Sequence, residues 1–170
     1  MNKKALLIAC IYSVLVIIYK LIIWQGGYIL SDFGFKYAQI VSVLAIIPCF
    51  IIVIKWIRDG ENGGVISGKE AMRAALIVVG ISAIILSVYN YFEFKMNIDT
   101  FTGYYKSDQY MAFLVKDPKA KQIGFQKIID SQISELSPFK ATTGKLFPFM
   151  VLSLSAAFVC AVFMKRDVAK

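Results

Sequence analysis

Four long apolar runs limit what this chain can fold into. They cover residues 5–24, 37–57, 71–92 and 146–164 of the 170-residue sequence. A helix rises 1.5 Å per residue, so about 20 apolar residues match the roughly 30 Å hydrocarbon core of a bilayer. The runs therefore predict an all-α integral membrane protein, a four-helix bundle that forms one membrane domain over residues 1–170. They leave no room for a separate soluble domain.

Composition argues against several functions. Histidine is absent, which removes the commonest general base and the commonest metal ligand. All three cysteines, Cys10, Cys49 and Cys160, fall inside apolar runs, where cysteine acts as a small hydrophobe, and they lack the spacing of a metal site. The sequence therefore predicts no catalytic residues, no cofactor and no metal, and we expect no enzyme activity.

The net charge of +8 favours a lipid surface over nucleic acid as its partner. No basic, aromatic-interleaved soluble domain is present to bind nucleic acid. Basic residues concentrate at the N-terminus, in the connection between the second and third runs and at the start of the third run, and at the C-terminus, and all three arginines lie in these segments. Because cytoplasmic loops carry an excess of lysine and arginine, we expect both termini in the cytoplasm.

Small residues recur every three or four positions on each run, as is typical of helices that approach closely in lipid. We expect these stripes to face the bundle interior, with contact between two copies of the chain as the alternative. Pro48 removes a backbone donor and should kink the second span. The stripes consist of Ala5, Ala9 and Ser13; Ala38, Ser42, Ala45 and Cys49; Gly80, Ala83 and Ser87; and Ser153, Ala157 and Ala161.

The connection over residues 94–145 is the largest aqueous segment. Helical spacing of apolar residues predicts a helix over 107–115 and an amphipathic helix over 119–137. Asp117 followed by Pro118 is typical of an N-cap and a first helical residue. These extracytoplasmic helices could lie on the outer leaflet, cap the bundle or meet a partner.

The densest local pattern lies between the second and third runs. Asn62, Gly63 and Gly64 indicate a tight turn, because glycine adopts a positive φ at little cost. Ser67 and Glu70 have the spacing of a capping box ahead of an apolar run. Arg58 would lie at the headgroups. Each residue has a local structural role, so the pattern predicts a turn, a cap and an anchor.

This segment resembles one family in particular. Arg58 through Ala71, Gly80, the Leu146-Phe-Pro-Phe start of the fourth run and its Lys165-Arg166 end are similar to the bacterial membrane family known as domain of unknown function 4199. The resemblance implies a small four-helix protein of the bacterial inner membrane, with a segment outside the membrane between helices three and four. It implies no activity.

Lys20 is the one clear charge inside a run. Its amine would reach the headgroups, or it would pair with Glu93 at the same end of the third run. No charged residue lies near the centre of any run, which argues against an ion-coupled transporter, and no charged ring or filter indicates a channel.

These patterns lead to two functional hypotheses. The first is a non-catalytic accessory or assembly subunit that binds other membrane proteins, or a second copy of itself, through its packing stripes and outer helices. The alternative is a carrier or binding protein for a lipid or small molecule, which would use apolar grooves without a central charge.

Overall fold

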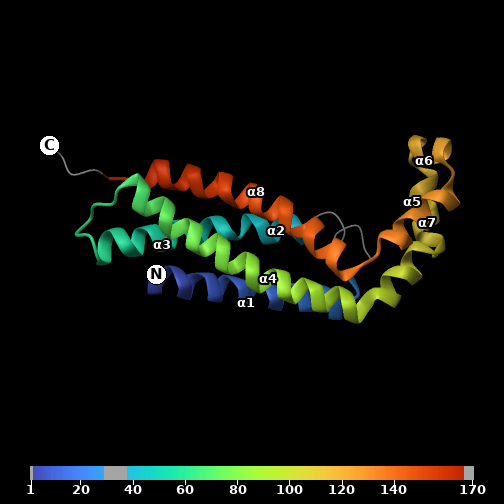
Figure 1. Cartoon of the computed structure of the whole chain (residues 1–170), viewed down its shortest axis with the longest axis horizontal. Helices are drawn as coiled ribbons and strands as arrows, with labels where there is room; N and C mark the ends of the chain where they lie inside the picture. Colours follow the sequence, from blue (N-terminus) through green and yellow to red (C-terminus); the bar gives the residue numbers. More distant parts are fainter. Residues whose placement is uncertain (1, 29–37, 167–170) are drawn as a thin grey trace. The chain divides into compact units, whose positions relative to one another are not determined.

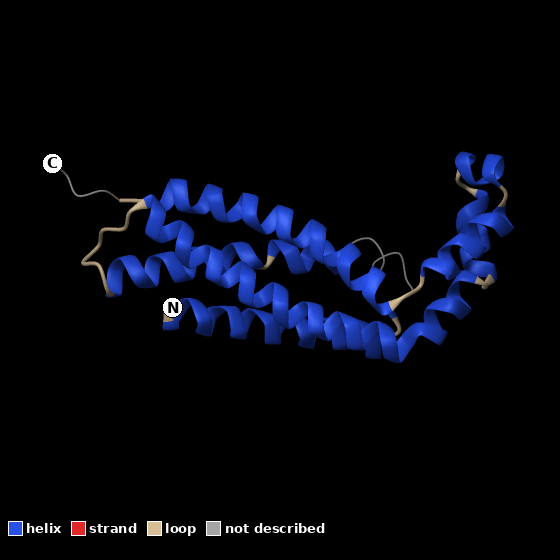
Figure 2. Cartoon of the chain, viewed as in Figure 1, coloured by secondary structure: helices blue, strands red, loops and turns tan. Residues whose placement is uncertain are grey.

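A computed structural model describes residues 2–28 and 38–166 (Figure 1). The described chain is helical, with no strand in either range (Figure 2). One antiparallel bridge joins Ile66 to Arg166. The all-α prediction is confirmed. The predicted start of the second span at residue 37 lies outside the described residues. The helices are α1 (Lys3–Gln25), α2 (Ala38–Leu44), α3 (Ile46–Gly60), α4 (Gly68–Tyr105), α5 (Asp108–Val115), α6 (Pro118–Ile123), α7 (Phe125–Glu135) and α8 (Pro138–Met164).

Four helical segments in the described chain are long and apolar enough to cross a membrane. They are Lys3–Gln25, Ile40–Gly60, Gly68–Tyr105 and Pro138–Met164. α4 continues past the third apolar run, and α8 begins before the fourth. The apolar run sets the length of helix that can lie in lipid. The helix itself can be longer, because its backbone hydrogen bonds form between residues four apart and do not require apolar side chains.

Contacts divide the chain into two compact units, which we describe separately. Unit 1 comprises Met1–Ser87 and Leu146–Lys170, and unit 2 comprises Val88–Lys145. A division by contacts does not establish independent folding. One membrane domain over the whole chain therefore stays a prediction.

The core of unit 1 is built from α1, α3, the first part of α4 and most of α8. Tyr12 on α1 is buried, and its hydroxyl donates to the backbone carbonyl of Ser42, at 2.7 Å. The Ser82 hydroxyl on α4 donates to the Ala9 carbonyl, at 3.4 Å. These bonds satisfy polar groups at helix contacts that water does not reach.

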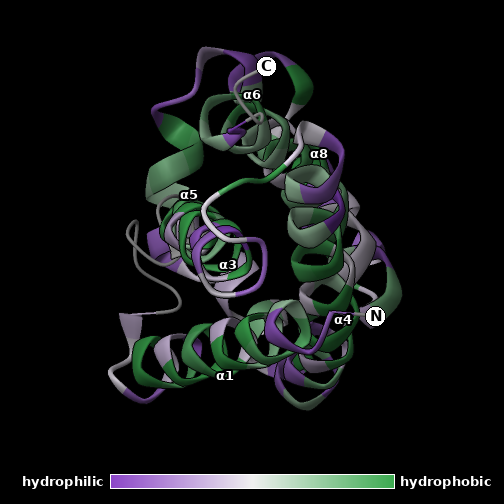
Figure 3. Ribbon diagram, turned by 90° about the vertical axis from the view of Figure 1, so that its left-hand side faces the viewer, coloured by the Kyte–Doolittle hydropathy of each residue, from purple (hydrophilic) through white to green (hydrophobic). Residues whose placement is uncertain are grey.

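The long helices of unit 1 are hydrophobic along much of their length (Figure 3), and many of their apolar side chains are exposed. Leu15, Ile84 and Phe163 have exposed fractions of 59%, 64% and 83%. A monomeric soluble protein rarely exposes apolar surface on this scale. Helices with apolar side chains on their outward face are suited to a lipid environment.

The small-residue stripes are buried as predicted on the first and last spans, where Ala9, Ser13 and Ala157 have no exposed surface. The prediction is only partly right elsewhere. Ala45 is exposed, because it lies at the break between α2 and α3, and the side chain of Ala38 lies outside the described residues. A Cβ placed on Gly80 meets no described atom within 4 Å, so this glycine does not mark a close approach.

The break at Ala45 follows from Pro48. A proline at this position has no backbone N–H for the carbonyl of Leu44, and its ring clashes with that carbonyl. α2 ends at Leu44 and α3 begins at Ile46. The predicted kink is confirmed.

In unit 2, the helices α5, α6 and α7 surround a small core of Tyr110, Leu114, Ala120 and Ile129. Burial raises the pKa of the Tyr110 phenol above its ordinary value, and the nearby Tyr104 adds to this. The core phenol therefore stays neutral.

The start of α6 has the predicted cap. Asp117 accepts a bond from the Lys119 N–H, at 2.9 Å, and Pro118 is the first residue of α6. The single helix predicted over 119–137 is wrong, because Gly124 separates α6 from α7 with a φ of 95°. The apolar period is similar on both sides of this glycine and conceals the break.

Candidate functional site

Glu93 is buried on α4 within a group of polar side chains in unit 2. Its Oε2 lies 3.6 Å from Lys145 Nζ on α8, and the Tyr89 hydroxyl donates to its Oε1, at 3.2 Å. The Lys145 ammonium also lies 4.5 Å from the centre of the Phe94 ring. A buried carboxylate is costly unless it has a cation and hydrogen-bond donors, and this arrangement supplies both.

Asn97 forms a kink in α4 one turn after Glu93. Its backbone is not helical, with φ −119° and ψ 16°. Its side-chain amide donates to the backbone carbonyl of Glu93, at 2.7 Å. In a regular helix, the N–H of residue 97 would bond this same carbonyl. The asparagine side chain therefore adds a bond to the backbone of α4 where the helix bends.

Thr142 lies one turn before Lys145 on α8. It is buried, and its hydroxyl has no hydrogen-bond partner among the described residues. Phe94 and Phe101 stack at 4.7 Å between ring centres. We name Tyr89, Glu93, Asn97, Thr142 and Lys145 the polar clamp, in which the ion pair of Glu93 with Lys145 joins α4 to α8 within unit 2. Nowhere in the described chain do three histidine, cysteine or acidic side chains gather as metal ligands would.

Sequence reasoning singled out Glu93 but missed Lys145 as its partner. The useful signal was position: Glu93 follows the third apolar run directly, and Lys145 directly precedes the fourth. Consecutive antiparallel spans bring such flanking residues to the same membrane surface. The predicted pair of Glu93 with Lys20 joins residues of different units, and it stays a prediction.

The turn between α3 and α4 contains the predicted motif. Ser67 Oγ accepts from the Glu70 N–H, at 3.3 Å, and Glu70 Oε2 accepts from the Ser67 N–H, at 3.1 Å. These two bonds form a capping box at the start of α4. Gly63 and Gly64 have φ values of 59° and 91°, which glycine adopts without strain.

Arg58 is buried at the end of α3. Its guanidinium donates to both carboxylate oxygens of Asp59, at 2.6 and 3.0 Å. Its backbone carbonyl accepts from the Gly64 N–H, at 2.8 Å. Arg58 therefore helps to hold the turn.

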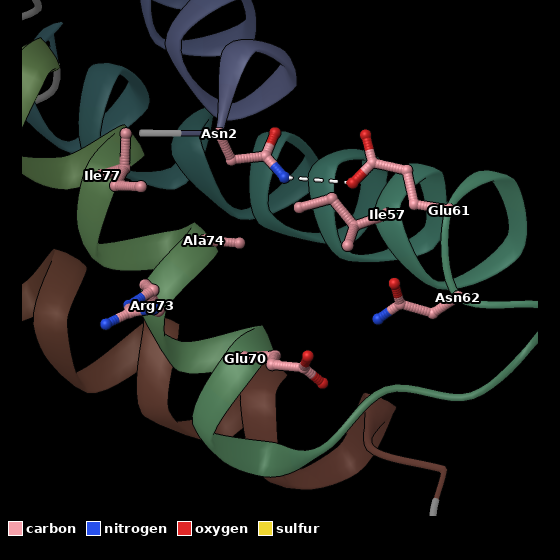
Figure 4. A pocket seen from close by; sticks show the side chains of 8 residues that line it. All are labelled: Asn2, Ile57, Glu61, Asn62, Glu70, Arg73, Ala74 and Ile77. Atoms are coloured by element: carbon pink, nitrogen blue, oxygen red, sulfur yellow. Dashed lines mark hydrogen bonds between the residues drawn. The ribbon is translucent and has the colours of Figure 1, made fainter.

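A pocket of about 570 Å³ lies beside this turn (Figure 4). The motif residues Asn62 and Glu70 line it, together with residues that the sequence did not mark: Asn2, Ile57, Glu61, Arg73, Ala74 and Ile77. Glu61 connects α3 to the N-terminus, because its carboxylate lies 3.2 Å from Lys4 Nζ and accepts from the Asn2 amide, at 3.3 Å. These contacts between distant segments have no local pattern.

Comparison with known proteins supports the resemblance found in the sequence. A family described as protein of unknown function (DUF4199) matches residues 3–166. No curated protein and no solved structure matches the chain.

Proposed function

Because the chain belongs to the DUF4199 family of proteins of unknown function, we propose a role from its own residues. In this proposal, the protein is a non-catalytic accessory subunit that binds another membrane protein through α5 of unit 2. The observation that carries the proposal is the composition of this short helix, which is apolar on nearly every side.

Only part of α5 is buried within the chain. Tyr110 and Leu114 belong to the core of unit 2, whereas Met111, Phe113 and Val115 are 36%, 45% and 48% exposed. A helix that is hydrophobic all round normally lies inside a larger structure. A partner would bury the remaining sides of α5.

The charges around α5 favour a protein over an anionic lipid surface. A helix that lies on such a surface carries lysine and arginine along its polar side. The only charged residue within α5 is Asp108. The helix ends at Val115, and the charged residues Lys116 and Asp117 come next in the chain. Charges of both signs beside an apolar centre are typical of a protein interface.

Exposed residues of α5 provide a test. Replacing Met111 and Val115 together with lysine should reduce the co-purifying protein by about tenfold, because it places two charges in the centre of the contact. The measurement is quantitative mass spectrometry after gentle extraction of the full chain from its native membrane.

Lysine substitutions at Ser131 and Gln132, which are exposed on α7, form the control and should retain the partner. A wild-type chain that purifies as a monomer without any other protein would contradict the proposal. A second copy of the chain in the complex would identify the partner as itself.

We also propose that the chain lies in the bacterial inner membrane with both termini in the cytoplasm. Contacts in unit 1 support this orientation. Lys4 Nζ donates to the carbonyl of Trp56, at 3.2 Å, and the backbone of Arg166 pairs with Ile66, so basic segments gather at one end. Such an end faces the cytoplasm under the positive-inside rule.

Reporter fusions test this orientation. Green fluorescent protein fused after residue 170 should fluoresce, and alkaline phosphatase fused after residue 116 should be active, because only the latter would leave the cytoplasm. A fluorescent protein fusion at residue 170 that stays dark, or a phosphatase fusion at residue 116 that stays inactive, would refute the proposed topology.

A further inference from the structure

The pocket beside the α3–α4 turn has the chemistry of a lipid site. We infer that it binds the headgroup of a zwitterionic phospholipid, which carries a primary ammonium next to a phosphate. This inference does not depend on the proposed role of α5, because every residue that it uses lies in unit 1.

The pocket is amphipathic. Its lining residues Ile57 on α3 and Ala74 on α4 are buried, whereas Asn62, Glu70 and Arg73 are exposed. Its volume of about 570 Å³ lies within the range of small-molecule sites. An apolar wall beside polar groups suits a ligand that has a polar head and a hydrocarbon body.

The position of the pocket is that of lipid headgroups. Its residues come from the start of α1, the end of α3 and the start of α4, all of which are membrane-spanning helices. The ends of such helices lie at the level of the polar headgroup region. A lipid could therefore reach the pocket without leaving the bilayer.

Three polar groups in the pocket are available to a ligand. Glu70 Oε2 accepts the bonds from Ser67, but its Oε1 accepts none from the described residues. The side chains of Asn62 and Arg73 likewise have no bond to any residue that the structure describes. By contrast, Glu61 is already engaged by Lys4 and Asn2.

Two of these groups, Glu70 and Asn62, match the ammonium of the headgroup. Figure 4 shows the Glu70 carboxylate and the Asn62 amide turned toward the space between α3 and α4, where both can accept from an ammonium. The Arg73 guanidinium points to the other side of α4 in Figure 4, so recognition in the pocket rests on the ammonium of the headgroup. A lipid without an amine would leave Glu70 without a cation.

Lipid competition tests the inference on the full chain. Wild-type protein in nanodiscs with equal amounts of phosphatidylethanolamine and phosphatidylglycerol should retain the amine-bearing lipid about fivefold more, as one exposed charged contact allows. The readout is the ratio of the two lipids bound in native mass spectrometry.

Glu70→Gln should abolish this preference, since glutamine keeps the capping box but removes the charge. Lys69→Gln, one residue away and outside the pocket, should keep it. Equal retention by the wild type, or an unchanged preference in Glu70→Gln, would overturn the inference. If that variant does not fold, Asn62→Ala replaces it and is judged by the same outcomes.

A soluble competitor identifies the source of the ligand. Displacement of the bound lipid by excess glycerophosphoethanolamine would support recognition of the headgroup alone. In that case, the pocket would also bind a water-soluble molecule that carries the same headgroup. Failure to displace it would support a membrane lipid, which also needs the apolar wall.

Discussion

Replacing Lys145 with methionine should lower the free energy of unfolding in detergent by about 2 kcal/mol. The Glu93 carboxylate is 5% exposed, and the substitution removes the ammonium 3.6 Å from it. Loss of one partner from a fully buried pair costs about 3–5 kcal/mol. The Lys145 side chain is 33% exposed, so solvent screening reduces the effect here.

Lys140→Met is the matched control, because Lys140 is an exposed lysine on the same helix. Its free energy of unfolding should stay within about 0.5 kcal/mol of the wild type. A double-mutant cycle of Lys145→Met with Glu93→Gln should give a coupling energy of about 1 kcal/mol or more. Equal effects of the two lysine variants would refute the polar clamp. A cycle with Lys20→Met would test the other predicted pair.

Replacing Leu114 with alanine should destabilise unit 2 by about 2–4 kcal/mol, because Leu114 is 4% exposed in its small core. Hydrogen exchange should show faster exchange of backbone amides in α5, α6 and α7. The amides of α1 should keep their protection, because Leu114 contributes nothing to the core of unit 1.

Val115→Ala provides the control for this prediction. Val115 is the next residue of α5 and is 48% exposed, so its truncation should change stability by less than about 0.5 kcal/mol. Faster exchange in α1 and α8 as well as in unit 2 would contradict local unfolding. That outcome would support one cooperative domain.

Much of the fold could be predicted from local patterns. The apolar runs predicted four spans, and the Ser67–Glu70 spacing predicted the cap at the start of α4. Pro48 predicted the break that lies at Ala45. Each of these features depends on residues within one or two turns, where backbone bonding and transfer to lipid act directly.

Other features could not be predicted in this way. The φ of Gly124 ended a helix in the middle of a continuing apolar pattern. Ala45 belongs to the stripe predicted on the second span but is exposed, and the break between α2 and α3 lies at this residue. The pocket gathered Asn2, Glu61 and Glu70 from three helix ends, and no spacing in the sequence connects them.

Apolar length was sufficient to predict four helices that are long and apolar enough to cross a membrane. The transfer of a helix into lipid depends on the length of its continuous apolar stretch and not on the tertiary contacts that its residues make. The partners of buried charges are a different matter. The energy of two charges depends on the distance between them in space and not on their separation along the chain. The contact of Glu93 with Lys145 therefore depends on how α4 packs against α8, two helices far apart in sequence.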